Sequence, residues 1–174
     1  MPTRQPLPTT WLMTDERMGD SLFAAIGRLP AGSGIVFRHY SLPEAERRAL
    51  FDRVRVAARG HLLLLAGPAA LAASWGADGS HGGGPGAGLH STPVHGLGEI
   101  RAAERDGAGL LFLSPVFATR SHPDARPLGL EGFGELVRET RLPVIALGGM
   151  DAARARETAA LGAHGWAGID AWLA

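Results

Sequence analysis

Histidines gather in this sequence at the points where strands are expected to end. Of the seven histidines, five lie at or just beyond the carboxyl end of a short apolar run: His39, His81, His90, His95 and His122. A neutral imidazole can accept or donate a proton near pH 7, so each is a candidate general acid or base, with a surface or capping residue as the alternative. Their spacings do not resemble a ligand pair such as His-x-x-x-His, which disfavours a metal cluster.

A pair of glycines could bind an anion. Gly148 and Gly149 follow a buried run that starts at Pro143 and precede a helix expected to open at Asp151. Such a turn exposes backbone N–H groups at the positive end of a helix, where barrels often hold phosphate. A plain tight turn between strand and helix is the alternative.

Arginine supplies further candidate anion ligands. In the run 36–40, strand alternation places Arg38 and Tyr40 on the same face, so both are expected in the mouth of the fold if either is. An inward Arg38 without an acid to pair with would require an anionic ligand, whereas an arginine that extends to the rim would not. The polar connection 114–131 is a candidate lid, in which Arg120, His122 and Arg126 could grip an anion, or else a solvated loop.

The elements that must position these residues alternate along the chain as parallel βα units do. Eight apolar runs are expected to be strands, at 10–14, 34–39, 61–66, 78–81, 88–92, 110–115, 143–148 and 165–170. Helices are expected at 19–29, 43–59, 68–75, 96–106, 130–140 and 151–161, with Pro43 in the first turn of the second. Gly-Ala recurs at 76, 107 and 162, where helices should stop.

Two helices are missing from this repeat. The fourth strand is followed by the glycine-rich segment 82–88, and only Ala171 to Ala174 follow the eighth. The repeat predicts a single domain, 1–174, folded as a shortened (β/α)8 TIM barrel with helix 4 and helix 8 reduced or missing. A doubly wound open sheet is the alternative.

Composition excludes several classes of function. Seventeen basic and seventeen acidic side chains cancel, so no global field would recruit nucleic acid. All the basic residues are arginine, which excludes Schiff-base lysines, and the absence of cysteine excludes thiolate chemistry. No apolar run approaches the length of a membrane span, so we expect a cytoplasmic chain without membrane contact.

The motifs together resemble the thiamin phosphate synthase family, which includes the thiazole tautomerase TenI. The similar segments are 11–15, 37–38, 75–81, 95–103, 113–119, 127–131 and 146–150. They include a Gly-Ala-Asp-Gly-x-His signature ending at His81 and a Pro-Val-Phe-x-Thr strand ending at Thr119. The resemblance implies a barrel that binds a small phosphorylated heterocycle, with a homodimer left open.

The sequence departs from that family at its metal and pyrophosphate ligands. The resemblance places Mg²⁺ ligands in an Asn-Asp pair after strand three, where this chain has Gly67-Pro68, and after the histidine of strand four, where it has the segment 82–85. Tyr40 and His122 stand where the family has pyrophosphate-binding lysines. Asp170 replaces a small residue in the second phosphate loop and would repel phosphate unless it turned away.

Three functions stay open. The leading hypothesis is a TenI-like, metal-independent proton transfer on a phosphorylated thiazole-like heterocycle, without a cofactor. The second is thiamin phosphate synthase activity, with Mg²⁺ at a relocated site that uses Asp78 or Asp124. The third is a non-catalytic ligand-binding or regulatory descendant. The candidate catalytic residues are His95 and His122, and the candidate ligand-binding residues are Arg38, Tyr40, His81, Thr119, Gly148, Gly149 and Asp170.

Overall fold

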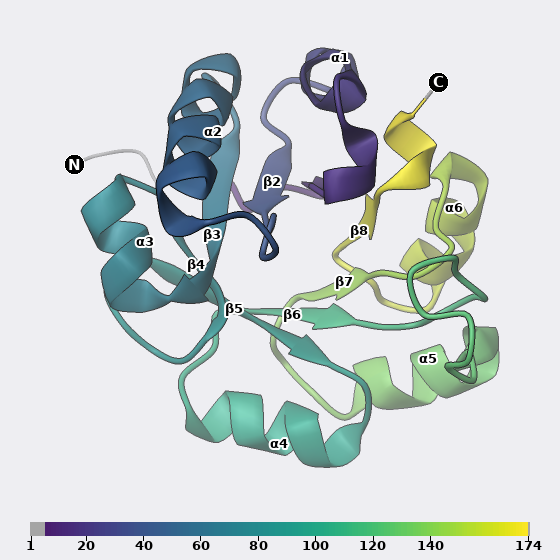
Figure 1. Cartoon of the computed structure of the whole chain (residues 1–174). Coiled ribbons are helices and arrows are strands. Elements are labelled where there is room, and N and C mark those ends of the chain that lie inside the picture. The colour runs from purple at the N-terminus through teal and green to yellow at the C-terminus, as the bar shows by residue number, and fades with distance from the viewer. Residues whose placement is uncertain (1–5, 174) are drawn as a thin grey trace.

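Eight parallel strands close into a barrel (Figure 1). The computed structural model describes residues 6–173. Each strand pairs with its neighbour in the chain, and β1 pairs with β8 through Thr10↔Trp166, Trp11↔Ala167 and Leu12↔Gly168. The strands are β1 (Thr10–Met13), β2 (Gly34–Phe37), β3 (Leu62–Pro68), β4 (Gly79–Gly83), β5 (Leu89–Val94), β6 (Leu110–Leu113), β7 (Val144–Ala146) and β8 (Gly165–Gly168). The predicted (β/α)8 barrel is confirmed and the open sheet is wrong.

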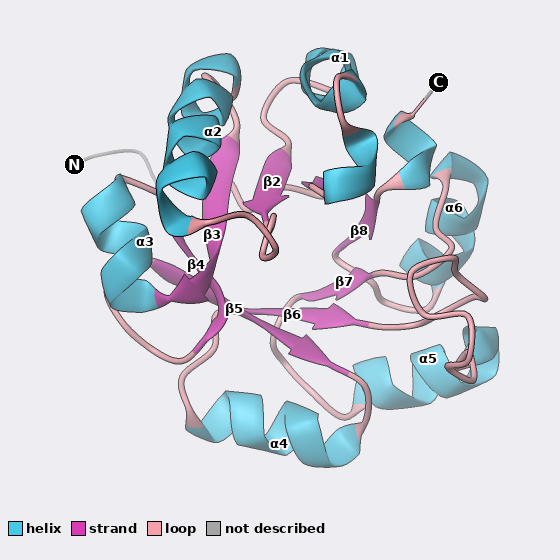
Figure 2. Ribbon diagram, in the orientation of Figure 1, coloured by secondary structure: helices cyan, strands magenta, loops and turns pink. Residues whose placement is uncertain are grey.

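Helices surround the barrel on its outside (Figure 2). They are α1 (Ser21–Arg28), α2 (Glu44–Ala57), α3 (Ala69–Trp75), α4 (Leu97–Arg105), α5 (Gly129–Arg138) and α6 (Ala152–Ala160), with short 3-10 helices η1 (Glu16–Met18) and η2 (Asp170–Trp172). Within residues 6–173, β4 continues to β5 without an intervening helix, and β8 is followed by η2 alone. The expected reduction of helices 4 and 8 is confirmed.

The local sequence explains where several helices begin and end. Gly76, Gly107 and Gly162 all have positive φ values, of 76°, 77° and 103°, as expected of glycines that terminate helices. Pro43 is the N-cap of α2 and does not lie in its first turn as expected, because its ψ of 145° is extended. Glu44 and Glu46 occupy the first turn, where carboxylates favour the positive end of the helix dipole.

Large apolar side chains fill the barrel and the layer between strands and helices. Trp11, Phe37 and Phe112 are fully buried, and the Trp11 and Phe112 rings meet edge to face at 5.3 Å. Close packing of this kind holds the strand ends in fixed positions. The functional side chains at those ends therefore stand on a rigid frame.

Strand lengths differ from the predicted runs where the mouth is built. Pairing of β3 with β4 continues to Gly67↔Gly82 and Pro68↔Gly83, beyond the predicted ends at Ala66 and His81. In contrast, β2 ends at Phe37, two residues early.

Among residues 6–173, none of the helices is both long and apolar enough to cross a membrane.

Candidate functional site

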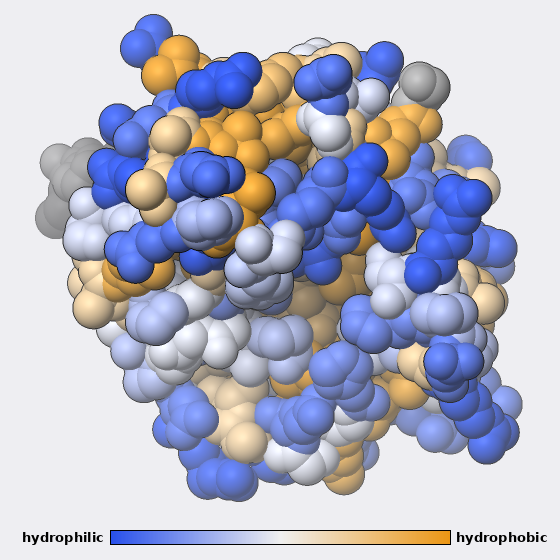
Figure 3. Space-filling model, in the orientation of Figure 1, coloured by the Kyte–Doolittle hydropathy of each residue, from blue (hydrophilic) through white to orange (hydrophobic). Residues whose placement is uncertain are grey.

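A cavity of about 310 Å³ opens at the carboxyl ends of the strands, within the size range of small-ligand sites. Figure 3 shows a hollow near the centre of this face, bordered by hydrophilic side chains. The cavity is lined by Met13, Arg17, Arg38, His95, Ser114, Pro115, Ala118, Thr119, Arg120, Ser121, His122, Ala125, Leu147, Gly148, Gly149, Met150, Ala167, Gly168, Ile169 and Asp170. It lies where (β/α)8 barrels place their active sites.

The turn after β7 has a backbone that only glycine fits. Gly148 and Gly149 have φ values of 100° and 62°. A Cβ atom on Gly148 would stand 2.7 Å from Cα of Pro115, and one on Gly149 would stand 2.5 Å from the carbonyl oxygen of Ala118. The first turn of α6 is already capped, because Asp151 accepts the N–H groups of Ala153 and Arg154 at 2.9 Å each. A phosphate would therefore use the amides of the Gly-Gly turn itself.

Arg38 reaches the cavity but has an acidic partner. Its Nη2 atom lies 2.8 Å from Oδ2 of Asp15, and its Nε donates to the Thr14 carbonyl at 2.7 Å. The condition under which an inward Arg38 would require an anionic ligand is therefore not met, because Asp15 follows the neighbouring strand β1 and pairs with it at the rim. Arg38 nevertheless lines the cavity.

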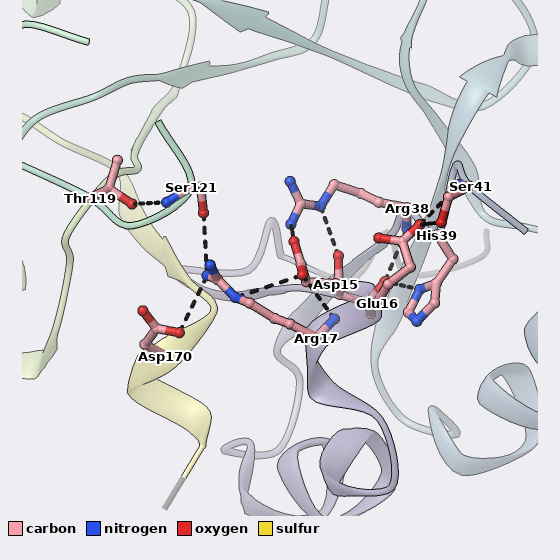
Figure 4. A network of polar contacts seen from close by, with 10 residues as sticks. Asp15, Glu16, Arg17, Arg38, His39, Ser41, Thr119, Ser121 and Asp170 are labelled. Atoms are coloured by element: carbon pink, nitrogen blue, oxygen red, sulfur yellow. Dashed lines mark hydrogen bonds and ion pairs between the residues drawn. The ribbon is translucent and has the colours of Figure 1, made fainter. Parts of the chain in front are cut away.

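Arg17 bridges three loops of the mouth (Figure 4). Its Nη2 atom lies 3.3 Å from Oδ1 of Asp170 and donates to the Ser121 hydroxyl at 3.2 Å, and its Nε lies 3.6 Å from Oδ1 of Asp15. Asp170 is thus turned toward a guanidinium, which offsets the repulsion that its carboxylate would exert on phosphate. Sequence reasoning missed Arg17, which a 3-10 helix after β1 carries to the rim.

His95 has a carboxylate partner on the next helix. Its Nδ1 atom lies 2.9 Å from Oε2 of Glu99, one turn into α4. A carboxylate only accepts hydrogen bonds, so Nδ1 carries a proton, and in the neutral ring the lone pair is then on Nε2. The four-residue spacing between His95 and Glu99 at the start of a helix was the available signal for this pair.

The loop between β6 and α5 covers one side of the cavity. Two of the three residues named in the lid hypothesis, Arg120 and His122, line the cavity, whereas the lining within residues 6–173 leaves out Arg126. Thr119 also lines it. The Thr119 hydroxyl accepts the N–H of Ser121 at 3.3 Å, which fixes the turn that brings Ser121 to Arg17.

Arg154 supports the Gly148–Gly149 turn from the first turn of α6. Its guanidinium donates to the carbonyl oxygen of Gly149 and lies 4.5 Å from the centre of the Phe117 ring. It places a positive charge beside the turn, and sequence reasoning missed it. The signal that could have revealed Arg154 was its position three residues after the helix N-cap Asp151.

Tyr40 lies outside the cavity. Because β2 ends at Phe37 and His39 has a φ of 45°, the alternation that would have turned Tyr40 inward breaks. Tyr40 is 63% exposed. The expectation that it shares the mouth with Arg38 is wrong.

Three other histidines are buried in polar pairs of their own. The Nδ1 atom of His39 lies 3.0 Å from the Thr14 hydroxyl, that of His90 3.0 Å from the Ser80 hydroxyl, and that of His81 2.8 Å from the Ser91 hydroxyl. Burial lowers the pKa of all three imidazoles, that of His81 to about 3. The structure does not bring His81 into the lining of the cavity. At neutral pH His81 is an uncharged ring that packs in the core.

The residues that follow β3 and β4 at the mouth do not fit a magnesium ion. Mg²⁺ takes hard oxygen ligands, mainly carboxylates, but the paired segments at Gly67↔Gly82 and Pro68↔Gly83 carry none. A Cβ atom on Gly83 would stand 2.0 Å from the Gly67 carbonyl oxygen, so an acid has no room there. In residues 6–173, no cluster of three or more His, Asp and Glu side chains could hold a metal ion.

The two acids considered for a relocated metal lie elsewhere. Asp78 precedes β4, at the end of the barrel opposite the mouth, and its Oδ2 accepts the N–H of Leu63 at 2.8 Å. Asp124 lies on the exposed loop before α5, and it too is left out of the cavity lining within residues 6–173.

A closed (β/α)8 barrel with a ligand-sized cavity at the carboxyl ends of its strands defines the class of this protein. Within that class, the chain belongs to the thiamine monophosphate synthase family, whose model matches residues 12–172. The predicted family is thereby confirmed.

Individual relatives agree with this assignment. The chain is 38% identical over 87 residues to a thiamine-phosphate synthase of Chloroflexus aurantiacus, covering 49% of this chain and 40% of that protein. It is 36% identical over 162 residues to a bifunctional thiamine biosynthesis protein of Symbiobacterium thermophilum, covering 83% of this chain and 34% of that protein. The chain spans less than half the length of the curated relatives it matches first.

A solved structure covers more of the chain. A thiamine phosphate pyrophosphorylase from Pyrococcus furiosus superposes with a TM-score of 0.80 at 27% identity, over 93% of this chain and 85% of that one. The fold and the family thus rest on nearly the whole length of the chain.

Proposed function

We propose that this protein binds a phosphorylated thiazole-like heterocycle and catalyses a metal-independent proton transfer on it, a tautomerisation. The observation that carries the proposal is the His95–Glu99 pair, with Nδ1 and Oε2 2.9 Å apart, on the same cavity as the Gly148–Gly149 turn. A proton shuttle and a phosphate anchor are the two parts that such a reaction needs.

The pair explains how one histidine can both take and return a proton. Glu99 holds the Nδ1 proton, so Nε2 is the base that accepts a proton from a carbon of the heterocycle. The carboxylate stabilises the imidazolium that results. Nε2 then returns the proton to a second ring position, so one bond to hydrogen breaks, another forms, and the composition of the ligand does not change.

The candidate anchors line the same cavity as His95. Backbone amides of the Gly148–Gly149 turn would hold the phosphate, and Arg38 would add a charge-assisted hydrogen bond. Thr119 and His122 of the covering loop are candidates for contacts with the heterocycle.

Substitution of His95 by Gln tests the proposal. We expect kcat for aromatisation of a thiazole phosphate tautomer, followed by proton NMR, to fall about 100-fold or more, because the transferring group is lost. The Kd for thiazole phosphate, measured by calorimetry, should change little. Glu99→Gln should lower kcat with the same small effect on Kd, and Glu135→Gln on the exposed face of α5 is the matched control. Turnover of His95→Gln at the parental rate would refute the proposal.

Synthase activity is a second candidate, since the relative in Chloroflexus aurantiacus is named a thiamine-phosphate synthase. The absence of carboxylates at Gly67–Pro68 and Gly82–Gly83 argues against it. A coupling assay with thiazole phosphate, pyrimidine pyrophosphate and Mg²⁺ distinguishes the two reactions. Binding of thiazole phosphate without turnover in either assay would instead indicate a non-catalytic descendant.

A further inference from the structure

The charges at the phosphate end of the cavity are mostly paired with one another. Arg38, Asp15, Arg17 and Asp170 form a continuous chain along the rim, with nitrogen–oxygen distances of 2.8, 3.6 and 3.3 Å between successive members (Figure 4). Two guanidinium groups and two carboxylates cancel. This chain therefore presents hydrogen-bond donors to a ligand but contributes no net charge.

The positive charge that is left belongs to two other arginines. Arg120 lines the cavity from the covering loop, and Arg154 lies beside the Gly148–Gly149 turn, where it donates to the Gly149 carbonyl. These two guanidinium groups, together with the N–H groups of the turn, could offset the two negative charges of a phosphate monoester at neutral to alkaline pH.

The Asp170 carboxylate opposes the binding of an anion that is more negative than a phosphate monoester. The carboxylate of Asp170 lines the cavity at the start of η2 and is about half exposed, with its side chain 47% accessible. A pyrophosphate group carries more negative charge than a monoester and would bring that charge closer to this carboxylate. Like charges this close repel, although water at the rim reduces the effect.

From this arrangement we infer that Asp170, held by Arg17, sets the charge of the ligand: the cavity accepts a phosphate monoester and rejects a pyrophosphate ester. The inference rests on the proposed function, because it concerns the phosphate end of the same site. It makes Asp170 a specificity-determining residue and Arg17 the residue that keeps its carboxylate from repelling a monoester.

Asp170→Asn tests the inference by removing one negative charge at nearly constant volume. The probes are inorganic phosphate and inorganic pyrophosphate, titrated by calorimetry at pH 8 and fixed ionic strength. The parent protein should bind phosphate more tightly than pyrophosphate. Asp170→Asn should strengthen pyrophosphate binding about tenfold more than phosphate binding, the scale of one half-exposed charge. Asp124→Asn makes the same charge change outside the cavity lining and should leave the ratio unchanged.

Arg17→Gln provides a second measurement, in which anion binding should weaken and not strengthen. Without its partner, the Asp170 carboxylate is unbalanced, so both anions should bind more weakly and pyrophosphate should lose more. Asp170→Ser serves as a replacement if Asp170→Asn does not fold, which its melting curve shows.

The outcomes separate this inference from the proposed function. An unchanged ratio of the two affinities in Asp170→Asn, or a parent protein that prefers pyrophosphate, would overturn the inference and leave the tautomerase proposal standing. A parent protein and variant that bind neither anion would overturn both, because the phosphate anchor would then be absent.

Discussion

At the scale of single residues, the partner of each charged or titratable group decides what it can do. His95 has one ring nitrogen paired with Glu99, as a base in the proposed reaction requires, whereas His81 is buried against Ser91 and stays neutral. Arg38 has part of its charge offset by Asp15. Residue type alone made these histidines equivalent candidates, and their neighbours distinguish them.

The Gly148–Gly149 turn gives a prediction at this scale. Gly149→Ala should lower the free energy of unfolding by about 1–3 kcal/mol, because a left-handed backbone and a Cβ contact of 2.5 Å with the Ala118 carbonyl oxygen both oppose it. The same change should abolish binding of inorganic phosphate. Urea denaturation and calorimetry measure the two effects. Gly98→Ala is the control: its Cβ would meet nothing within 4 Å, and inside α4 it should be neutral or stabilising. Equal stability of Gly149→Ala and the parent would contradict the prediction.

At the scale of elements, one buried arginine ties α2 to the ends of two strands. Arg47 is 9% exposed, and its guanidinium donates to the carbonyls of Arg38 at 2.8 Å and Ala66 at 2.7 Å. Arg38 directly follows the last residue of β2, and Ala66 lies near the end of β3. Arg47 therefore fixes the backbone that carries Arg38 to the cavity.

Arg47→Met should destabilise the fold by about 1–3 kcal/mol, because it leaves two carbonyls without their donor while keeping most of the side-chain volume. We also expect weaker phosphate binding through displacement of Arg38. Chemical denaturation gives the first effect, and Arg55→Met on the exposed side of α2 should cost less than about 0.5 kcal/mol. If the two variants unfold at the same denaturant concentration, the role assigned to Arg47 is wrong.

At the scale of the whole molecule, closure of the barrel buries polar side chains that an open sheet would leave exposed to solvent. His81 is 5% exposed and lies edge-on to Phe112 at 5.1 Å, with its pKa lowered to about 3 by burial. Burial also lowers the pKa values of His39 and His90. Folding therefore favours the neutral form of these imidazoles.

This burial predicts sensitivity to acid. Between pH 6.5, the ordinary pKa of histidine, and about 3, the unfolded chain binds a proton at His81 and the folded chain does not, so stability falls as pH falls. The contribution of His81 is about 1.4 kcal/mol per pH unit in this window. Urea denaturation at several pH values from 6 to 4 gives the free energy of unfolding as a function of pH. This free energy should fall less steeply with falling pH in His81→Asn than in the parent. Identical slopes would mean that His81 is protonated in the folded protein.

The sequence by itself determined the order and type of the elements. Eight apolar runs, the glycine stops at 76, 107 and 162, and the missing fourth and eighth helices all follow from patterns that act over a few residues. Local conformational preference and the burial of apolar side chains fix these features, so reading along the chain recovers them. The family motifs, which lie on those elements, followed in the same way.

Only the tertiary structure decided which side chains meet. Arg17 and Asp170 lie 153 positions apart, and Asp15 and Arg38 follow the ends of neighbouring strands, so their pairing depends on closure of the barrel and on where each strand ends. Tyr40 was misplaced because β2 stops before it and His39 turns the chain. The energy of an ion pair depends on distance in space, and the strands bring together at the mouth charges that the sequence keeps far apart.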